Sequence, residues 1–405
     1  MLTIFKIQGI YFLANIIVSF IFLWGLPVGS YAIYFFCTSF TAITAVLCDL
    51  GLSQSLVNRS ASMSNNRYGV ISSYKSASLI SGFYVFLPIL GFIILYGVFG
   101  NSFSYIRENF YLVLLSIFIG AAQSQLQMLR SIFIGLRDNK MQAISYLSEA
   151  GVRMILSPLI LYFSNASIAL LINLLAIILT ALTVLKISRF PKIENTPLII
   201  ESWALIKESF PLAPMQAYYI IQNQIPPFLI AYFGITTDLA SYGALGRILI
   251  GFSFVSVVLA TYLQPIFAKQ DMLAVSIKRL WQISLSWTLI SCTLILIGAY
   301  LPQMPLFVLG AQYSGLVDEV FFTILVGCVT VFGVIFYCMA LSVANRNAQY
   351  LAIFPCMFLQ LVTILSVDEF SVVNATLISL APSIGYMVFQ IAIGMHALFF
   401  LKKVK

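Results

Sequence analysis

Long apolar segments recur along the whole chain, and short polar stretches separate them. A hydrocarbon core about 30 Å thick requires about 20 apolar residues per helix, and the spanning backbone must form helices or a closed barrel. The segments are continuously apolar and do not alternate, which excludes barrel strands. The pattern predicts an all-α polytopic membrane protein whose helices lie at about residues 4–26, 31–57, 74–99, 109–134, 142–163, 167–187, 211–233, 238–268, 279–300, 319–343, 350–366 and 371–400.

The longest polar interval lies at residues 186–211, with six apolar segments on either side. We therefore predict an N-terminal six-helix lobe at residues 1–187, a cytoplasmic linker at 188–210 and a C-terminal six-helix lobe at 211–405. Two lobes in the same orientation can enclose a central cavity that opens alternately to either side of the membrane.

The linker carries its own helical pattern. Thr196 and Pro197 are typical of a helix start, and Pro211 marks the far end. Apolar residues recur at helical spacing, with Glu201 and Glu208 on the other face. We predict a helix along the inner membrane surface that joins the lobes, with an apolar stripe formed by Ile199, Trp203, Ile206 and Phe210.

Composition and charge agree with this picture. Charged residues make up 8% of the chain and hydrophobic residues 61%, far from the values of a soluble domain. A net charge of +8 would suggest nucleic acid in a soluble protein, but here the basic residues flank apolar segments and indicate orientation. Of the 21 Lys and Arg residues, 18 fall on one side. We predict that this side, with both termini, is cytoplasmic, and we expect no nucleic-acid partner.

The two halves show signs of duplication. A single offset of 208 residues relates Tyr11 and Asn15 to Tyr219 and Asn223, and it also relates Tyr34 to Tyr242. Together with the matching helix number, these identities favour an internal repeat.

Four short motifs lie near helix ends, and they are Asp49-Leu50-Gly51-Leu52, Gly135-Leu136-Arg137-Asp138-Asn139, Tyr242-Gly243-Ala244-Leu245-Gly246-Arg247 and Leu309-Gly310-Ala311-Gln312-Tyr313. In these motifs, its length and its helix number, the chain resembles the polysaccharide-transport branch of the multidrug/oligosaccharidyl-lipid/polysaccharide exporter superfamily. Within that branch it is most similar to the O-antigen flippases.

This resemblance implies a function in lipopolysaccharide and polysaccharide biosynthesis. The expected activity is transfer of an undecaprenyl-pyrophosphate-linked oligosaccharide from the cytoplasmic to the periplasmic leaflet of a bacterial inner membrane, ahead of polymerisation. The expected partners are the polysaccharide polymerase and chain-length proteins of the same pathway.

Charges inside the spans are the strongest candidates for function, because an Arg at a helix centre costs about 2.5–3.5 kcal/mol on insertion scales. Arg247 lies about nine residues inside the eighth helix, without an acidic residue at i±3 or i±4. We predict that Arg247 binds a pyrophosphate or an acidic sugar, and the alternative is a tertiary ion pair with Glu149.

Arg153 follows Glu149 by one helical turn. This pair is either a self-neutralised structural element or a proton-coupled site in which Arg153 binds the anionic headgroup and Glu149 accepts the proton.

Other candidates lie nearer the membrane surface. Arg59 and Arg130 are interpreted as side chains that extend to the interface, or else as basic groups that recruit a pyrophosphate lipid. Asp49 is a second candidate for proton coupling. Asn15 and Asn223 are candidates for binding sugar hydroxyls, although hydrogen bonds between helices are the commoner use of Asn in membranes.

Pro226 and Pro227 remove two amide donors from the seventh helix, so we predict a bend or break there that could serve as a hinge, with simple packing as the alternative. The chain has no C-x-x-C pair, metal-ligand cluster, phosphate-binding glycine loop or nucleophile motif, so we expect neither a cofactor, a metal nor enzyme activity. The alternatives to a flippase are a multidrug or small-molecule antiporter of the same superfamily and, further off, a polytopic glycan polymerase or acyltransferase.

Overall fold

The computed structural model is helical throughout the part of the chain that it describes, with no strand there. The described residues are 2–63, 67–99, 104–188, 198–211, 213–233, 236–267, 273–343, 351–367 and 370–403. The chain divides into two compact units, Met1–Thr236 and Thr237–Lys405.

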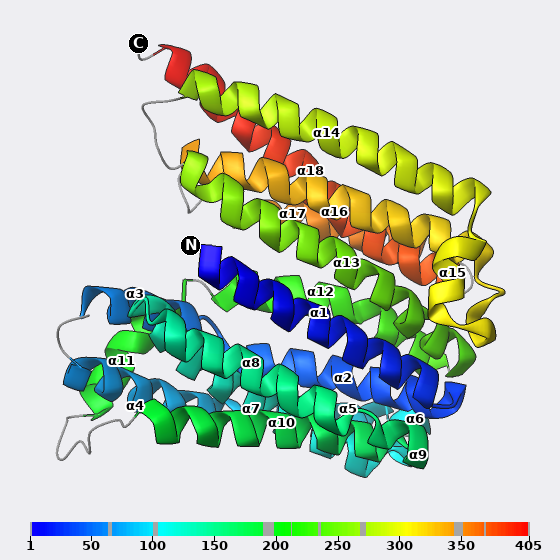
Figure 1. Cartoon of the computed structure of the whole chain (residues 1–405), viewed down its shortest axis with the longest axis horizontal. Helices are drawn as coiled ribbons and strands as arrows, with labels where there is room; N and C mark the ends of the chain where they lie inside the picture. Colours follow the sequence, from blue (N-terminus) through cyan, green and yellow to red (C-terminus); the bar gives the residue numbers. More distant parts are fainter. Residues whose placement is uncertain are drawn as a thin grey trace. The chain divides into compact units, whose positions relative to one another are not determined.

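The helices are labelled in Figure 1. In the first unit they are α1 (Leu2–Gly25), α2 (Val28–Asp49), α3 (Leu52–Ser62), α4 (Arg67–Tyr84), α5 (Phe86–Phe99), α6 (Ser104–Glu108), α7 (Phe110–Gly135), α8 (Asn139–Leu156), α9 (Leu159–Phe163), α10 (Ala166–Ser188), α11 (Leu198–Ser209) and α12 (Ala213–Phe233). The others are α13 (Thr236–Phe267), α14 (Leu273–Tyr300), α15 (Gln303–Leu309), the 3₁₀ turn η2 (Ala311–Tyr313), α16 (Val317–Val343), α17 (Ile353–Leu365) and α18 (Val372–Lys403).

Among the described residues, ten helical stretches are long and apolar enough to cross a membrane. Two of these spans are composite, since α4 with α5 forms one and α8 with α9 another. The shorter apolar helix α17 and the helix α12 lie at the eleventh and seventh predicted spans. The twelve predicted segments are thus all helical, while several of their boundaries differ.

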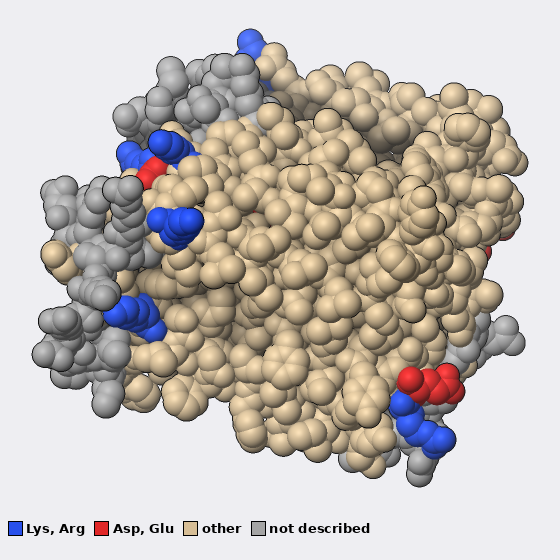
Figure 2. Space-filling view, turned by 60° about the horizontal axis from the view of Figure 1, so that its bottom comes forward, with Lys and Arg blue, Asp and Glu red and all other residues tan. Residues whose placement is uncertain are grey.

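Charged side chains in the first unit gather at one end of its helices. The exposed residues there are Lys75, Arg137, Lys140, Lys186 and Lys207, and we call this the basic end. Arg107 and Glu108 lie in α6, at the other end. In Figure 2 most of the visible Lys and Arg side chains lie at one end, a basic side chain beside an acidic one lies at the other end, and no charged side chain is seen across the middle. This distribution fits an apolar belt bounded by polar ends.

The predicted helix at 31–57 is wrong as a single element, because it ends at Asp49 and restarts at Leu52. Leu50 and Gly51 both adopt left-handed backbone angles, with φ of 37° and 87°. The Asp49 carboxylate accepts hydrogen bonds from the backbone N–H and the hydroxyl of Ser53, at 2.9 and 2.5 Å. The motif at residues 49–52 therefore ends one helix and caps the next.

The motif at residues 135–139 forms the junction between α7 and α8. A Cβ at Gly135 would lie 2.5 Å from the carbonyl oxygen of Val57, so only glycine allows α7 this close to α3. Arg137 adopts a left-handed φ of 55°, and the Asp138 side chain accepts a hydrogen bond from Met141 N at 3.1 Å. This cap starts α8 and fixes its direction relative to α7.

The linker helix is present as α11, which packs against α3 and α4 at the basic end. Leu205 is fully buried in a cluster with Leu52, Leu56, Ala77, Ile80 and Met128. Glu208 accepts two hydrogen bonds from Arg59, at 2.8 and 2.9 Å. The helix therefore has an apolar anchor and a bidentate ion pair to the first unit.

The apolar stripe predicted for this helix is only partly observed. Trp203 and Phe210 are 63% and 72% exposed, as lipid-facing residues would be, but Ile206 packs against the Leu205 cluster. The predicted helix start at Thr196 and Pro197 lies outside the described residues, as do the side chains of Ile199 and Glu201. The predicted role of the helix in joining two lobes stays a prediction.

Leu205→Ala is expected to destabilise the docking of α11 by about 2–5 kcal/mol, because it opens a cavity in a closed apolar cluster. Limited proteolysis at α11 and thermal unfolding in detergent would measure the effect. The matched variant Trp203→Ala, at an exposed position of the same helix, should change stability by about 0.5 kcal/mol or less. Equal effects of the two variants would contradict the observed docking.

The division into compact units falls one helix later than the predicted lobe boundary. Helix α12 packs against α2 and belongs to the first unit, whereas the sequence places it at the start of the second lobe. Of the predicted bend or break at Pro226 and Pro227, the break is not observed, since both residues lie inside the continuous helix α12, and the bend stays a prediction. Both side chains are buried, which agrees with prolines tolerated by packing. Their hinge role stays a prediction.

The internal repeat has a structural counterpart in two local hydrogen bonds. Asn15 Nδ2 donates to the Tyr11 carbonyl oxygen at 2.9 Å, and Asn223 Nδ2 donates to the Tyr219 carbonyl oxygen at 2.8 Å. The offset of 208 residues also places α1 on α12 to within three residues and makes α2 start where α13 starts, at residue 236, although α13 continues ten residues further.

A second pair of contacts joins helices that correspond to each other under the offset of 208 residues. Asn173 Nδ2 donates to the Tyr34 hydroxyl at 3.2 Å, which joins α10 to α2. Tyr242 and Ser379 share a hydrogen bond of 2.7 Å between their hydroxyls, which joins α18 to α13. Equivalent helices are thus linked through equivalent tyrosines, as expected of two copies of one unit.

Candidate functional site

A buried polar cluster lies where α1, α7 and α8 meet in the first unit, and Glu149 is at its centre. The Glu149 side chain is 0% exposed, although it sits in a helix long and apolar enough to span a membrane. Glu149 and Arg153 lie one turn apart in α8, and the α7–α8 junction turns this face of α8 toward Arg130 of α7.

Arg130 forms the first cationic side of the cluster. Its Nε donates to the Ser145 hydroxyl at 2.7 Å, and Nη2 donates to the Ser145 carbonyl oxygen at 3.0 Å. Nη2 also pairs with Glu149 Oε2. The side chain is 3% exposed, so the interpretation that Arg130 extends to the membrane surface is wrong. Its polar partners on α8 hold it in the interior instead.

Arg153 forms the second cationic side. Its Nη2 lies 2.5 Å from Glu149 Oε1, and its Nη1 donates to Asn15 Oδ1 at 3.0 Å. The ion pair predicted from the spacing is thus present, but it is not self-contained, because Arg130 shares the same carboxylate. The Arg153 side chain is 15% exposed, and its buried Nε donates no hydrogen bond within the described residues.

Two tyrosines enclose the cluster. The Arg130 guanidinium lies 4.4 Å from the ring centroid of Tyr146 and 5.7 Å from that of Tyr11, distances at which cations interact with aromatic rings. The two rings meet edge to face, with centroids 5.0 Å apart. The Tyr11 hydroxyl also donates to Glu149 Oε2 at 3.4 Å. The aromatic rings and the two hydrogen bonds to Ser145 fix Arg130 more firmly than Arg153.

The charges of the cluster do not cancel. Two guanidinium groups share a single carboxylate, which leaves one excess positive charge inside the membrane-spanning part of the unit. Buried charges are stable when they are paired and hydrogen-bonded, and an anion would complete the pairing here. Guanidinium groups bind phosphate and carboxylate oxygens in a bidentate manner. The arrangement can therefore hold an anionic group beside Arg153.

The second copy of the repeat does not carry this cluster. At an offset of 208 residues, the counterparts of Arg130, Glu149 and Arg153 are Cys338, Met357 and Leu361. The second half thus has apolar or uncharged residues at all three positions.

Of the remaining predicted site residues in the first unit, Arg59, Asp49 and Asn223 make their hydrogen bonds to residues outside this cluster. Arg59 is paired with Glu208 and Asp49 caps α3, so both have structural contacts. Asn223 is exposed in α12, and Arg247 is partly buried in α13. Their assignments as substrate-binding or proton-coupling residues stay predictions.

The fold now defines a class of protein. It is similar to the inward-facing conformation of a multidrug resistance MATE family transporter of the MOP superfamily, with a TM-score of 0.66 and 14% identity, over 97% of this chain and 95% of that one. It also matches MATE in the straight conformation, with a TM-score of 0.62 and 14% identity over 99% and 94% of the two chains. The match to MATE in the bent conformation has a TM-score of 0.61 and 14% identity, over 99% of this chain and 93% of that one. The chain is therefore a multi-pass membrane protein with the MATE-type fold, as predicted.

The family is narrower than the fold. Residues 1–271, from α1 through α13, match the family described as "Polysaccharide biosynthesis protein", and the chain belongs to that family. No curated protein matches it. The resemblance found in the sequence is thus confirmed.

Proposed function

We propose that this protein is a flippase that carries an undecaprenyl-pyrophosphate-linked oligosaccharide unit across the bacterial inner membrane by alternating access. The observation that carries the proposal is the net positive cluster of Arg130, Glu149 and Arg153, buried among spanning helices of a polysaccharide biosynthesis protein. In this proposal the basic end of the first unit is cytoplasmic, as are both chain termini, in agreement with the distribution of Lys and Arg.

The chemistry of the cluster suits a pyrophosphate. Arg153 is the more accessible of the two arginine side chains, 15% exposed against 3% for Arg130, and guanidinium groups donate strong hydrogen bonds to phosphate oxygens. Glu149 holds both guanidinium groups in place without cargo, and its pairing with Arg153 loosens when a phosphate takes over part of that contact. Proton uptake by Glu149 at that stage is our further hypothesis, and Asp49 is the second candidate. The polysaccharide polymerase and chain-length proteins remain the proposed partners.

The alternative of a multidrug antiporter is supported by the similarity of the fold to that of a multidrug resistance MATE family transporter. Cationic drugs, however, would meet the excess positive charge of the cluster, which repels them. A glycan polymerase or acyltransferase is the more distant alternative. Deletion of the gene separates the flippase from the multidrug antiporter, since loss of a flippase abolishes surface polysaccharide and leaves drug sensitivity unchanged.

Arg153→Ala is expected to abolish or strongly reduce surface polysaccharide in the complemented deletion strain, because it removes the accessible guanidinium. Arg153→Lys keeps the charge and should retain part of the activity, although it loses the bidentate geometry. Surface polysaccharide and the accumulated lipid-linked precursor would be measured at matched protein levels. Arg107→Ala, at the exposed far end, is the control and should behave as the wild type. Full activity of Arg153→Ala would overturn the proposal.

A further inference from the structure

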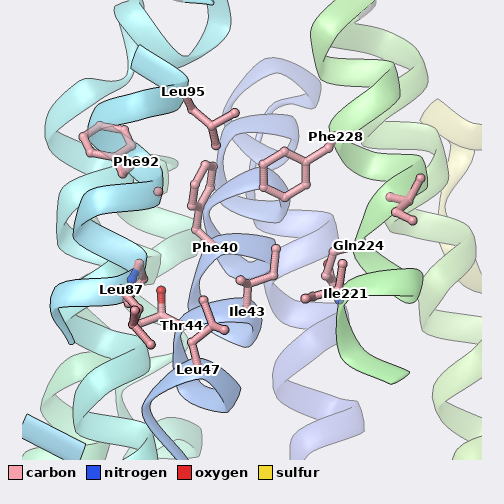
Figure 3. Close-up of a pocket in the computed structure, with 13 residues that line it drawn as sticks. Phe40, Ile43, Thr44, Leu47, Leu87, Phe92, Leu95, Ile221, Gln224 and Phe228 are labelled. Atoms are coloured by element: carbon pink, nitrogen blue, oxygen red, sulfur yellow. The ribbon is translucent and has the colours of Figure 1, made fainter. Parts of the chain in front are cut away.

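A separate apolar pocket of about 220 Å³ lies between α2, α5 and α12 of the first unit. Figure 3 shows its lining side chains, among which Phe40, Leu95 and Phe228 converge between the three helices. Among the lining residues only Thr44 and Gln224 have polar side chains. Two of the three helices, α2 and α5, belong to stretches that are long and apolar enough to cross a membrane, and the apolar lining suits a hydrocarbon.

Aromatic rings form one wall of the pocket. The ring centroids of Phe40 and Phe228 are 4.9 Å apart, and those of Phe40 and Phe92 are 6.3 Å apart. Phe40 and Phe92 are buried, so their rings are held in place by packing. Leu87 and Ile221 at the rim are partly exposed, which leaves the pocket open on that side.

The pocket is connected to the charged cluster through α7. Thr44 packs against Gly120 of α7, where an added Cβ would lie 2.6 Å from Thr44 Cβ. Arg130 follows ten residues later in the same helix, which is about 15 Å at 1.5 Å per residue. A molecule with an anionic head and a long apolar chain has the reach to occupy both sites.

We propose that this pocket receives a segment of the polyprenyl chain of the lipid-linked cargo. The inference rests on the proposed function, since it assigns the tail of the same molecule whose pyrophosphate would bind at Arg153. A chain of eleven isoprene units, when extended, is longer than the hydrocarbon core of about 30 Å, so part of it must fold or be held by protein. Its branching methyl groups can pack against the aromatic wall of the pocket, where a straight acyl chain offers no branches.

Gly91 makes the inference testable. It lines the pocket, and an added Cβ there would meet nothing within 4 Å, so Gly91→Leu fills the space without a clash at the backbone. Gly82 of α4 is equally free of neighbours but does not line the pocket, and Gly82→Leu is the matched control. Purified full-length protein in nanodiscs would be labelled with a polyprenyl phosphate that carries a diazirine on its chain, and the labelled peptides mapped by mass spectrometry.

We expect labelling of peptides that contain Phe40, Phe92 or Phe228. This labelling should fall about tenfold in Gly91→Leu, because the leucine takes the volume of the bound segment, and should persist in Gly82→Leu. Unchanged labelling in Gly91→Leu would overturn the pocket assignment. Equal labelling by a diazirine phospholipid with straight acyl chains would overturn the choice of a polyprenyl chain and make the pocket a general lipid site.

The cellular assay separates this inference from the proposed function. If Gly91→Leu lowers both labelling and surface polysaccharide at normal protein levels, the pocket serves transport. If the wild-type protein is labelled in the pocket but its gene does not restore surface polysaccharide to the deletion strain, the proposed function fails while the polyprenyl site stands.

Discussion

Glu149→Gln is expected to cause the largest loss of stability among single substitutions in the charged cluster. The change keeps the shape of the side chain but leaves two guanidinium groups of α7 and α8 side by side without their counter-ion. Breaking a buried ion pair by removing one partner costs about 3–5 kcal/mol. We expect less protein in the membrane and a lower unfolding temperature in detergent, measured by fluorescence-detected thermal denaturation.

Glu208→Gln is the matched control for this variant. Glu208 also pairs with an arginine, but its side chain is 48% exposed, and exposed pairs contribute about 1 kcal/mol or less. The double variant Glu149→Gln/Arg130→Met should recover part of the lost stability, because it removes one of the two unbalanced charges. The expectation would be contradicted if Glu149→Gln were as stable as the wild type and its transport in vesicles lost only the response to an imposed pH gradient. Glu149 would then bind a proton and contribute nothing to stability.

Gly120→Ala is expected to separate α7 from α2. A Cβ at this position would lie 2.6 Å from the Thr41 carbonyl oxygen and 2.6 Å from Thr44 Cβ, and neither neighbour is the end of a flexible side chain. Overpacking of this kind costs about 1–3 kcal/mol. The variant should unfold at a lower temperature and lose transport.

Gly82→Ala is the control, and it is expected to raise stability where Gly120→Ala lowers it. An added Cβ at Gly82 meets nothing within 4 Å, and replacement of a helical glycine by alanine stabilises a helix by about 0.5–1 kcal/mol. A fall in stability of similar size for both variants would show that the α2–α7 contact is looser than the structure has it.

Much of the fold follows from hydropathy alone, because each spanning helix needs one long apolar run. Hydropathy does not predict that the helix at residues 31–57 is interrupted after Asp49, because the apolar pattern of the sequence continues past this residue. Only the geometry at Leu50 and Gly51 ends the helix. At Pro226 and Pro227 the local rule predicts a bend or a break, and the helix continues through both residues without a break.

The site was partly predictable for a similar reason. Glu149 and Arg153 are neighbours at one helical turn, so their spacing in the sequence predicts the contact. Arg130 is 19 residues from Glu149, on another helix, and only the turn at Arg137 and Asp138 brings it into the cluster. Nothing in the sequence predicts that Ser145 and Tyr146 belong to the charged cluster, although both lie on α8 within about one turn of Glu149. Intramembrane arginines are better assigned after helix junctions are known.

The junction between α2 and α3 also divides the first unit mechanically. Across residues 50 and 51 the Asp49 side chain takes the place of backbone acceptors, so the two helices do not form one rigid rod. Helix α3 is tied to α11 through Arg59 and Glu208, and both α2 and α3 pack on α7. A change of the angle between α2 and α3 at residues 50 and 51 would therefore have to break the close contact between Gly135 of α7 and Val57 of α3.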